Sequence, residues 1–245
     1  MSGGKDSGIG VDCAINLDFV QLRVEIMFML IRRDDHILFI GDSITDGGRE
    51  ESASGLGAGY VSLVAGRLFM DYPEKQLCIS NRGVSGNRLG DLLERLGPDV
   101  LDLEPAPTIV SILVGINDVW AVFEEGDEEA EPVPVTQFYE DYTRLCRRVV
   151  EKLKARLVVM EPFCLPVEPV TAEWHGELDP KIQAVRQIAT DFSAPLIPLD
   201  GLFTAACSYA QPEYWTEDGV HPTLAGHQLI ADAWLDAVRR AKSAA

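Results

Sequence analysis

Basic residues are scarce in this sequence. Lysine and arginine together number 21 against 39 aspartate and glutamate residues, which gives the 245-residue chain a formal net charge of −18. A field of this sign repels phosphate backbones and anionic lipid surfaces. The composition therefore predicts that neither nucleic acid nor a membrane is a partner, and it suits a neutral or cationic small molecule.

Cysteine is also infrequent, and its spacing does not suit cross-linking. No two cysteines have the Cys-x-x-Cys spacing, and an odd count argues against a complete disulfide framework. Reduced, buried cysteine is the ordinary interpretation, so we expect a reducing, cytoplasmic location. The five residues are Cys13, Cys78, Cys146, Cys164 and Cys207.

The chain lacks a long unbroken apolar run. Three charged residues interrupt its apolar N-terminal stretch, residues 13–31: Asp18, Arg23 and Glu25. This stretch fits neither a membrane span nor a signal peptide, and its alternation favours a strand. We predict an N-terminal extension over residues 1–26, followed by one domain over residues 27–245. The extension is an added edge strand or arm, or else sequence upstream of a start at Met27.

Motifs for bound metals and nucleotides are absent. There is no His-Glu-x-x-His segment and no cysteine/histidine cluster, and no Gly-x-Gly-x-x-Gly or Walker loop follows a predicted strand. A Gly-x-Ser-x-Gly elbow is missing too, because the glycines around Ser85 have the wrong spacing. We therefore predict neither a cofactor nor a metal site.

The sequence does contain a regular alternation of strand and helix patterns. Short apolar runs predict strands, and stretches with apolar residues at helical spacing separate them. The predicted strands are residues 36–40, 76–84, 108–115, 156–163 and 194–200. The predicted helices are residues 59–72, 89–103 (with a Gly-Pro break), 135–155, 180–192, 201–210 and 223–241.

This alternation predicts an α/β protein, a three-layer α/β/α sandwich around a five-stranded parallel sheet. Hydrophobic residues make up 47% of the chain, enough to cover both faces of such a sheet. In a flavodoxin-like strand order, the switch point lies between the first and third strands, where ligands bind beyond the carboxyl ends. The acidic run at 124–131 is expected to be a solvated surface loop.

Four polar segments follow the predicted strands. Ser43 comes after the first strand, residues 81–83 after the second, residues 115–118 after the third, and residues 218–221 after the fifth strand and its short helix. Because the carboxyl ends of parallel strands share one edge of a sheet, we expect these segments to converge.

Ser43, Asp218 and His221 supply the groups that acyl transfer requires. A serine hydroxyl is a weak nucleophile until a base accepts its proton, and imidazole titrates near working pH. Asp218 lies three residues before His221, so its carboxylate can meet one ring nitrogen across a turn, whereas the other three histidines show no such partner. Pro222 places His221 at a stiff junction before the last helix. An ordinary Asp-Gly turn that caps this helix is the structural alternative.

Three groups are candidate donors to a tetrahedral oxyanion. Gly83 offers a backbone N–H without an obstructing side chain, Asn117 offers an uncharged amide, and Ser43 offers its own N–H. The structural alternatives are a turn at the end of a strand for Gly83 and an Asx-turn for Asn117.

Taken together, these segments resemble the SGNH hydrolase superfamily, also called the GDSL esterases and lipases. "GDSIT", "GIND" and "DGVHP" are similar to three of its sequence blocks, with Ile44 where leucine is commonest, and Gly83 is similar to a fourth. The resemblance spans residues 36–241 and implies the flavodoxin-like SGNH fold.

The resemblance also implies a role for each matched residue. Ser43 is the implied nucleophile, His221 the base and Asp218 the acid that orients it. The implied oxyanion hole consists of Ser43, Gly83 and Asn117.

Longer stretches look like the bacterial carbohydrate acetylesterases of this superfamily, especially intracellular xylan or xylo-oligosaccharide deacetylases. These stretches are "GDSITDGGR", "GYVSLV", "NRGVSGN" and "GINDVW". The likeness implies a serine esterase that deacetylates O-acetylated carbohydrates through an acyl-enzyme on Ser43, and a homo-oligomer. Asp42, Trp120 and Trp215 are the predicted substrate contacts; for the two tryptophans, simple packing is the alternative.

Two other functions stay open. A lipolytic or thioesterase-type acyl hydrolase of the same fold would need a long apolar groove, and no run outside the predicted core suggests one. A non-catalytic carbohydrate-binding or structural protein is disfavoured by the complete set of Ser43, Asp218 and His221.

Overall fold

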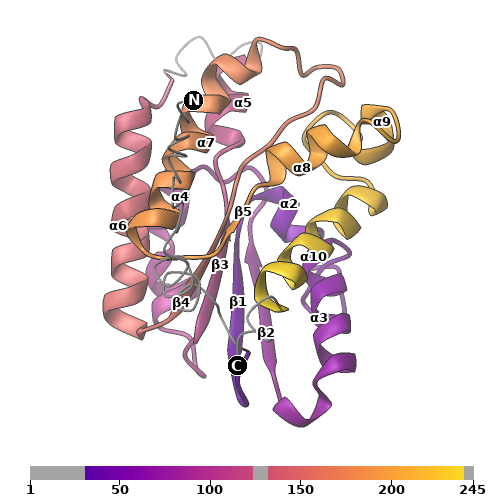
Figure 1. Cartoon of the computed structure of the whole chain (residues 1–245). Helices are drawn as coiled ribbons and strands as arrows, with labels where there is room; N and C mark the ends of the chain where they lie inside the picture. Colours follow the sequence, from indigo (N-terminus) through magenta and orange to yellow (C-terminus); the bar gives the residue numbers. More distant parts are fainter. Residues whose placement is uncertain (1–30, 124–131, 240–245) are drawn as a thin grey trace, which may run out of the picture.

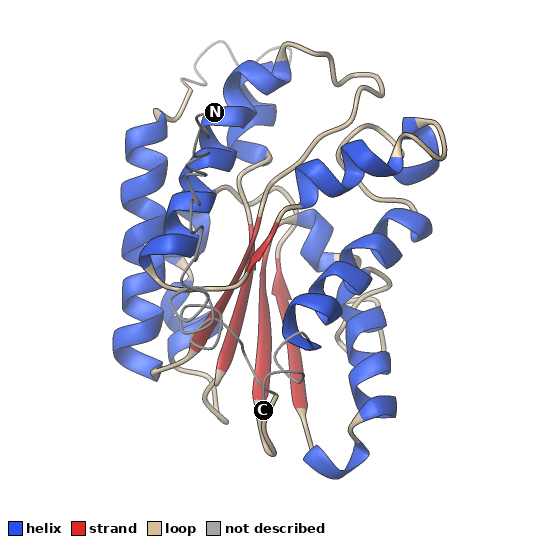
Figure 2. Cartoon of the chain, viewed as in Figure 1, coloured by secondary structure: helices blue, strands red, loops and turns tan. Residues whose placement is uncertain are grey.

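The computed structural model describes residues 31–123 and 132–239. Five strands form one parallel sheet in the order β2-β1-β3-β4-β5, with helices on both of its faces (Figures 1 and 2). The predicted fold class, strand count and switch point between the first and third strands are confirmed. The predicted extension over residues 1–26 and the acidic run at 124–131 lie outside the described residues.

The sheet and its helices follow the predicted alternation. The strands are β1 (His36–Gly41), β2 (Cys78–Gly83), β3 (Ile109–Leu113), β4 (Arg156–Met160) and β5 (Leu196–Ile197). The helices are α2 (Ser43–Asp46), α3 (Tyr60–Asp71), α4 (Leu89–Glu94), α5 (Asn117–Phe123), α6 (Val135–Leu153), α7 (Trp174–Asp191), α8 (Leu199–Ala206), α9 (Pro212–Trp215) and α10 (Leu224–Arg239). Two single turns are η1 (Pro73–Lys75) and η2 (Gly97–Leu101).

Three boundaries differ from the prediction for physical reasons. β5 is only two residues long, because Pro195 and Pro198 flank it and neither can donate to a strand ladder. α7 begins at Trp174 and contains Pro180, because buried side chains in its first turns hold it against the core. The Gly-Pro break separates α4 from η2, and the short helices α2, α5 and α9 have too few residues to show a period.

Alternate residues of each strand face opposite layers of the core. In β1, Ile37 and Phe39 join one apolar cluster, whereas Leu38 and Ile40 join the other. Helices α3, α8 and α10 pack with the first cluster, and α4 and α6 with the second, while α7 contributes to both. Figure 1 shows these helices as the outer layers of the sandwich.

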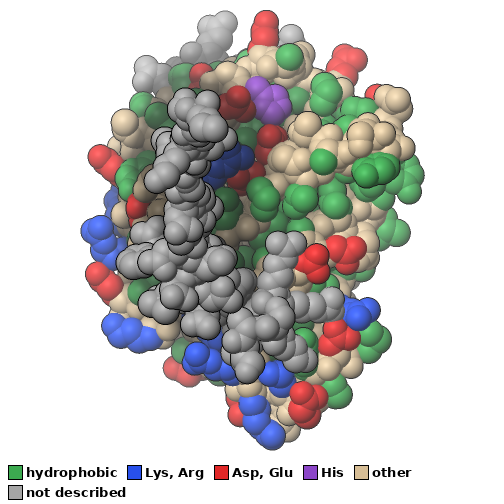
Figure 3. Space-filling view, viewed as in Figure 1, with side chains coloured by type: hydrophobic (Ala, Val, Ile, Leu, Met, Phe, Trp, Pro, Cys, Tyr) green, Lys and Arg blue, Asp and Glu red, His purple; other side chains and the backbone are tan. Residues whose placement is uncertain are grey.

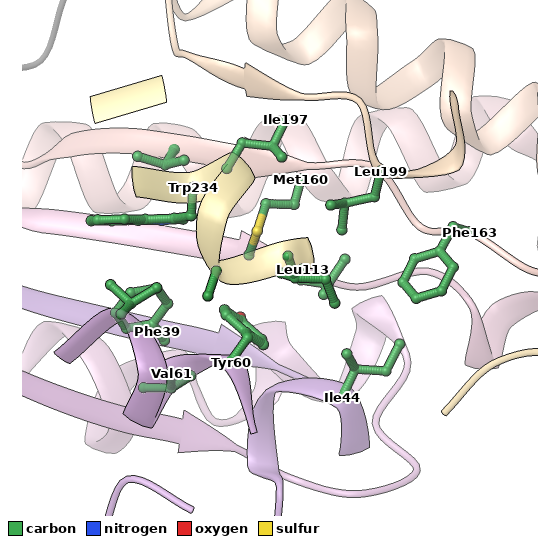
Figure 4. Packing of buried hydrophobic residues seen from close by; sticks show 14 of the residues in the cluster. Phe39, Ile44, Tyr60, Val61, Leu113, Met160, Phe163, Ile197, Leu199 and Trp234 are labelled. Carbon is green, nitrogen blue, oxygen red and sulfur yellow. The ribbon is translucent and has the colours of Figure 1, made fainter. Parts of the chain in front are cut away.

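Trp234 of α10 anchors the C-terminal helix on the sheet. Its ring lies 5.3 Å from the ring of Phe39, centroid to centroid, and its Nε1–H donates to Ser111 Oγ at 3.0 Å. Figure 4 shows Trp234 within a group of side chains that come from β1, β3, β4 and several helices. Residues 218–221 come shortly before α10 in the chain, so this packing helps to hold them at the carboxyl edge of the sheet.

No helix in the part of the chain that the structure describes is long and apolar enough to cross a membrane.

Candidate active site

Ser43 lies at the sharp turn between β1 and α2. Asp42 precedes it as the N-cap, and Asp42 Oδ1 accepts the amide N–H of Ile44 at 3.1 Å. Ser43 is therefore the first residue of a helix, and its own N–H has no acceptor inside that helix. In Figure 1, α2 stands at the upper end of β1, which is the carboxyl edge of the sheet.

Asn81 of β2 holds this turn in place. Its buried side-chain amide donates to the carbonyl oxygens of Thr45 at 2.6 Å and Leu56 at 2.9 Å, and its Oδ1 accepts the N–H of Gly83 at 2.9 Å. A buried amide with its hydrogen bonds satisfied is a rigid link. Asn81, which lies in one of the predicted polar segments, is thus a positioning residue for the turn that carries Ser43.

The Asp218 carboxylate shapes the second half of the site. One oxygen, Oδ1, accepts the backbone N–H groups of Val220 at 3.0 Å and His221 at 2.8 Å, so it builds the turn. The other oxygen, Oδ2, lies 2.7 Å from His221 Nδ1. The predicted turn and the predicted acid–base pair are therefore one structure, and neither interpretation excludes the other.

His221 joins the two halves. Its Nε2 lies 2.9 Å from Ser43 Oγ, although the residues are 178 positions apart in the chain. With its Nδ1 proton directed at Asp218, the ring presents a free lone pair on Nε2 to the serine hydroxyl. Serine, imidazole and carboxylate thus form the chain of contacts that activates a serine nucleophile.

The pKa of Asp218 is lowered. Partial burial alone would raise it, but the hydrogen bonds from the backbone and ring of His221 and from the Val220 amide outweigh burial. The carboxylate therefore stays ionised at neutral pH and keeps its hold on the imidazole.

Gly83 does not lie in the site, which contradicts the prediction that it is an oxyanion donor. Its N–H is already bound to Asn81, and a Cβ at this position would lie 2.2 Å from the backbone nitrogen of Asp46. Gly83 is therefore needed for the close packing of β2 against α2. This tertiary contact could not be read from the sequence.

Gly86 takes the place that the sequence interpretation gave to Gly83. It lines the pocket beside Ser43 with a φ of +80°, and its N–H has no acceptor among the described residues. Asn117, the first residue of α5, lies in the same pocket, and one of its side-chain N–H groups donates to the carbonyl oxygen of Asn87 at 3.0 Å. The second N–H remains for a ligand.

The pocket has a volume of about 340 Å³, near the lower end of the range for small-molecule sites. Its lining is mixed, with hydroxyl, amide, guanidinium, imidazole and aromatic groups. The lining residues are Ser43, Ser85, Gly86, Arg88, Asn117, Trp120, Ala121 and His221. Ser85 is the other hydroxyl in the pocket, but its Oγ donates to Asp46 Oδ2 at 2.9 Å and contacts no histidine.

Of the three predicted substrate contacts, only Trp120 lines the pocket. Its ring lies 6.2 Å from the ring of His221 and meets Trp174 edge-on at 5.2 Å, and Trp174 in turn stacks on Phe123 at 5.1 Å. This aromatic group holds Trp120 as a rigid wall beside the imidazole.

The structure does not place Asp42 or Trp215 in this pocket. Asp42 is 1% exposed and serves as a helix cap, so a substrate cannot reach it. Trp215 ends α9 outside the pocket lining, and its carbonyl oxygen accepts the N–H of Thr223 at 3.0 Å. It supports the approach to α10 instead.

Two buried carboxyl groups are chain neighbours of pocket residues: Asp42 precedes Ser43, and Asp118 follows Asn117. Burial raises the pKa of Asp42 to about 7, although a hydrogen bond from the Ile44 amide opposes the shift, and Asp42 Oδ2 has no hydrogen-bond partner among the described residues. Burial also raises the pKa of Asp118 to about 6, although the Leu89 amide donates to it. These groups are poorly accommodated as anions.

A second histidine–carboxylate pair corrects the expectation that only His221 has one. His175 lies on α7, and its Nδ1 is 2.9 Å from Asp179 Oδ1, while its Nε2 faces the buried Cys164 Sγ at 3.7 Å. Burial raises the pKa of Cys164 to about 12, so the group carries no thiolate. On the face shown in Figure 3, one histidine stands among acidic side chains.

No group of metal-ligating side chains occurs within residues 31–123 and 132–239.

Comparison with known proteins agrees with this geometry. Residues 39–229 match the GDSL-like lipase/acylhydrolase family. The chain belongs to this family. Its members are carboxylic ester hydrolases, so the chain is an esterase or acylhydrolase, and the predicted superfamily is confirmed.

Individual relatives of the GDSL-like family cover most of the chain. An acetylxylan esterase from Geobacillus stearothermophilus is 33% identical over 220 residues, which are 84% of this chain and 95% of that protein. The crystal structure of Axe2, an acetylxylan esterase from the same organism, has a TM-score of 0.77 at 31% identity and covers 86% of this chain and 96% of Axe2. LAE5, an α/β hydrolase enzyme from the metagenome of Lake Arreo, has a TM-score of 0.77 at 30% identity, with 86% and 97% covered.

Four pocket residues were missed by sequence reasoning: Ser85, Gly86, Arg88 and Ala121. The signal for the first three was their place directly after β2, in a loop with a glycine that ends at the start of α4. For Ala121 the signal was its spacing from Asn117, one helical turn further along α5.

The role of the Asn117 amide is tested by Asn117→Ala. Loss of one oxyanion donor should lower kcat about 10²–10³-fold, with a much smaller change in KM, because the donor acts mainly on the charge of the transition state. Steady-state hydrolysis of p-nitrophenyl acetate measures both constants, and urea unfolding checks that the variant is folded. A kcat within twofold of wild type would show that Asn117 is not an oxyanion donor.

The raised pKa of Asp42 predicts a pH dependence of stability. A carboxyl whose pKa rises from 3.8 to about 7 on folding binds more protons in the native state between these values, so stability falls as pH rises through this window. Asp42→Asn keeps a capping oxygen but carries no charge. From pH 5 to pH 8, the free energy of unfolding of the variant minus that of wild type should therefore increase by roughly 2 kcal/mol.

Urea denaturation of both proteins at pH 5 and pH 8 measures this gain. The same difference in stability between variant and wild type at the two pH values would contradict a raised pKa at Asp42.

Proposed function

We propose that this esterase removes acetyl groups from O-acetylated carbohydrates, with xylo-oligosaccharides as the substrate class. The observation that carries the proposal is the small, mixed pocket of about 340 Å³ around Ser43 and His221. It suits a short acyl group and one sugar unit. The similarity to an acetylxylan esterase over 84% of the chain supports the same substrate class.

In the proposed acylation step, Ser43 Oγ attacks the acetyl carbonyl carbon while its proton passes to His221 Nε2. The resulting imidazolium is stabilised by Asp218, whose lowered pKa keeps it anionic. The oxyanion accepts hydrogen bonds from the N–H groups of Ser43 and Gly86 and from the Asn117 amide. The C–O bond to the sugar then breaks, and the sugar oxygen takes the proton from His221.

In the proposed deacylation step, water replaces the sugar alcohol. His221 removes a proton from this water as it attacks the acetyl carbonyl, and the same donors hold the second oxyanion. Collapse of this intermediate releases acetate, and the proton returns to Ser43 Oγ. Trp120 provides a flat apolar wall beside His221, suited to the face of a sugar ring.

The lipolytic alternative receives less support. A long acyl chain needs an extended apolar groove, whereas polar groups make up much of the lining of this pocket. No observation in the described part of the chain favours a second candidate function.

Substrate assays test the proposal. We expect acetate release from acetylated xylo-oligosaccharides, and a kcat/KM at least about tenfold higher for p-nitrophenyl acetate than for p-nitrophenyl octanoate, because the pocket excludes the longer chain. Ser43→Ala supplies the background rate.

Two outcomes would contradict the proposal in different ways. A preference for the octanoate ester would favour lipolytic action. Hydrolysis of p-nitrophenyl acetate without release of acetate from the sugars would keep the acetylesterase but remove the carbohydrate substrate.

A further inference from the structure

Arg88 is the only lysine or arginine among the described residues that line the pocket. It occupies the N-cap position of α4, so the backbone from which its side chain extends is held by a helix start. Its side chain is half-buried and shares the pocket with Ser43, Asn117 and His221. Nothing in the proposed deacetylation of a neutral sugar requires a positive charge here.

The backbone around Arg88 is fixed by two carboxylates. Asp91 Oδ2 accepts the N–H of Arg88 at 2.7 Å, and the buried Asp118 Oδ2 accepts the N–H of Leu89 at 3.1 Å. Both contacts are to main-chain groups. The position of the Arg88 Cα is therefore set before any ligand arrives, which lowers the entropy cost of binding through its side chain.

The guanidinium itself makes no hydrogen bond and no ion pair within residues 31–123 and 132–239. The nearby acids are engaged elsewhere: Asp218 with the turn and ring of His221, and Asp91 and Asp118 with backbone amides. The charge of Arg88 acts on Asp118 only at longer range, where it opposes the effect of burial on that pKa. Arg95, by contrast, is paired, because it donates to Asp99 Oδ2 at 2.9 Å.

An unpaired guanidinium beside a reactive serine can bind a carboxylate. Its planar fork of N–H groups matches the two oxygens of a carboxylate, and such bidentate contacts are stronger than hydrogen bonds to neutral hydroxyl groups. The chain carries a net charge of −18, which disfavours anionic substrates in general. A cation in the pocket attracts an anionic group locally and so offsets this repulsion at one position.

We propose that Arg88 binds a carboxylate on the alcohol part of the ester, so that the enzyme prefers acetylated sugars that carry an acidic group, as uronic acid units do. This assignment rests on the proposed deacetylation at Ser43. The acetyl carbonyl oxygen accepts hydrogen bonds from the oxyanion donors, and the sugar extends between Arg88 and Trp120. Arg88 is a specificity residue in this arrangement, because it contacts the leaving group and not the reacting carbonyl.

Matched pairs of substrates test this assignment. The first pairing compares phenyl acetate with an acetoxybenzoate, either the 3- or the 4-isomer. Each isomer differs from phenyl acetate only by its carboxylate. The second pair is a mono-acetylated methyl xyloside against the corresponding acetylated methyl glucuronoside. The variants are Arg88→Gln, Arg88→Lys and, as a matched control, Arg67→Gln, which removes an exposed arginine on α3 that pairs with Asp71.

We expect wild type to prefer the acidic member of each pair. Arg88→Gln should lower kcat/KM for acidic substrates about 10–100-fold, mostly through KM, because one charge-assisted pair is lost, while neutral substrates stay within twofold. Arg88→Lys should keep part of the preference, since it retains the charge but loses the fork. Arg67→Gln should match wild type on all substrates.

The assignment is overturned if wild type shows no preference for the acidic aryl esters, or if Arg88→Gln slows both members of a pair equally. Either result leaves the proposed function standing when acetate is still released from the xyloside. The converse is distinguishable: if neither sugar is hydrolysed but the aryl pair shows a preference that depends on Arg88, the carbohydrate substrate fails and the carboxylate contact stands.

Discussion

The contact between Ser43 Oγ and His221 Nε2 joins two segments that are 178 positions apart in the chain. The sheet and its helices together hold the two atoms 2.9 Å apart. Ser43 is delivered by β1, a strand that is buried along its whole length. His221 is delivered by the approach to α10, which Trp234 anchors on the same sheet. Because β1 and β5 run parallel in one sheet, the segments that follow them lie at the same edge, so the chemistry depends on the register of the sheet.

Several polar side chains at this edge hold backbone in place. Asp218 folds its own turn with one oxygen and orients His221 with the other. Asn81 ties the turn after β1 to β2, and Asp42 starts the helix that carries Ser43. These contacts make the site rigid before a substrate enters, which is the condition for electrostatic stabilisation of an oxyanion without reorganisation. The same arrangement buries two carboxyl groups, Asp42 and Asp118, and burial raises the pKa of each.

Much of this was predictable from the sequence, because it depends on local pattern. Apolar runs located the five strands, and the positions of Ser43, Asn117 and His221 after strands brought them to one edge. The failures arise where a tertiary contact decides. Gly83 looked like a donor, but Asn81 takes its N–H, and Gly86 lies in the pocket instead. Asp42 is adjacent to Ser43 in the chain yet faces the core, and no spacing in the sequence reports which way a single residue in a sharp turn points.

We propose Ser43 as the nucleophile and His221 as the base that activates it. Intact-mass analysis after treatment with a serine-directed fluorophosphonate, followed by peptide mapping, tests this most directly. We expect one adduct per chain, located on Ser43, and much slower labelling in His221→Ala, because no imidazole is left to accept the hydroxyl proton. An adduct on Ser85, the other hydroxyl in the pocket, or no adduct on the folded wild-type protein, would contradict it.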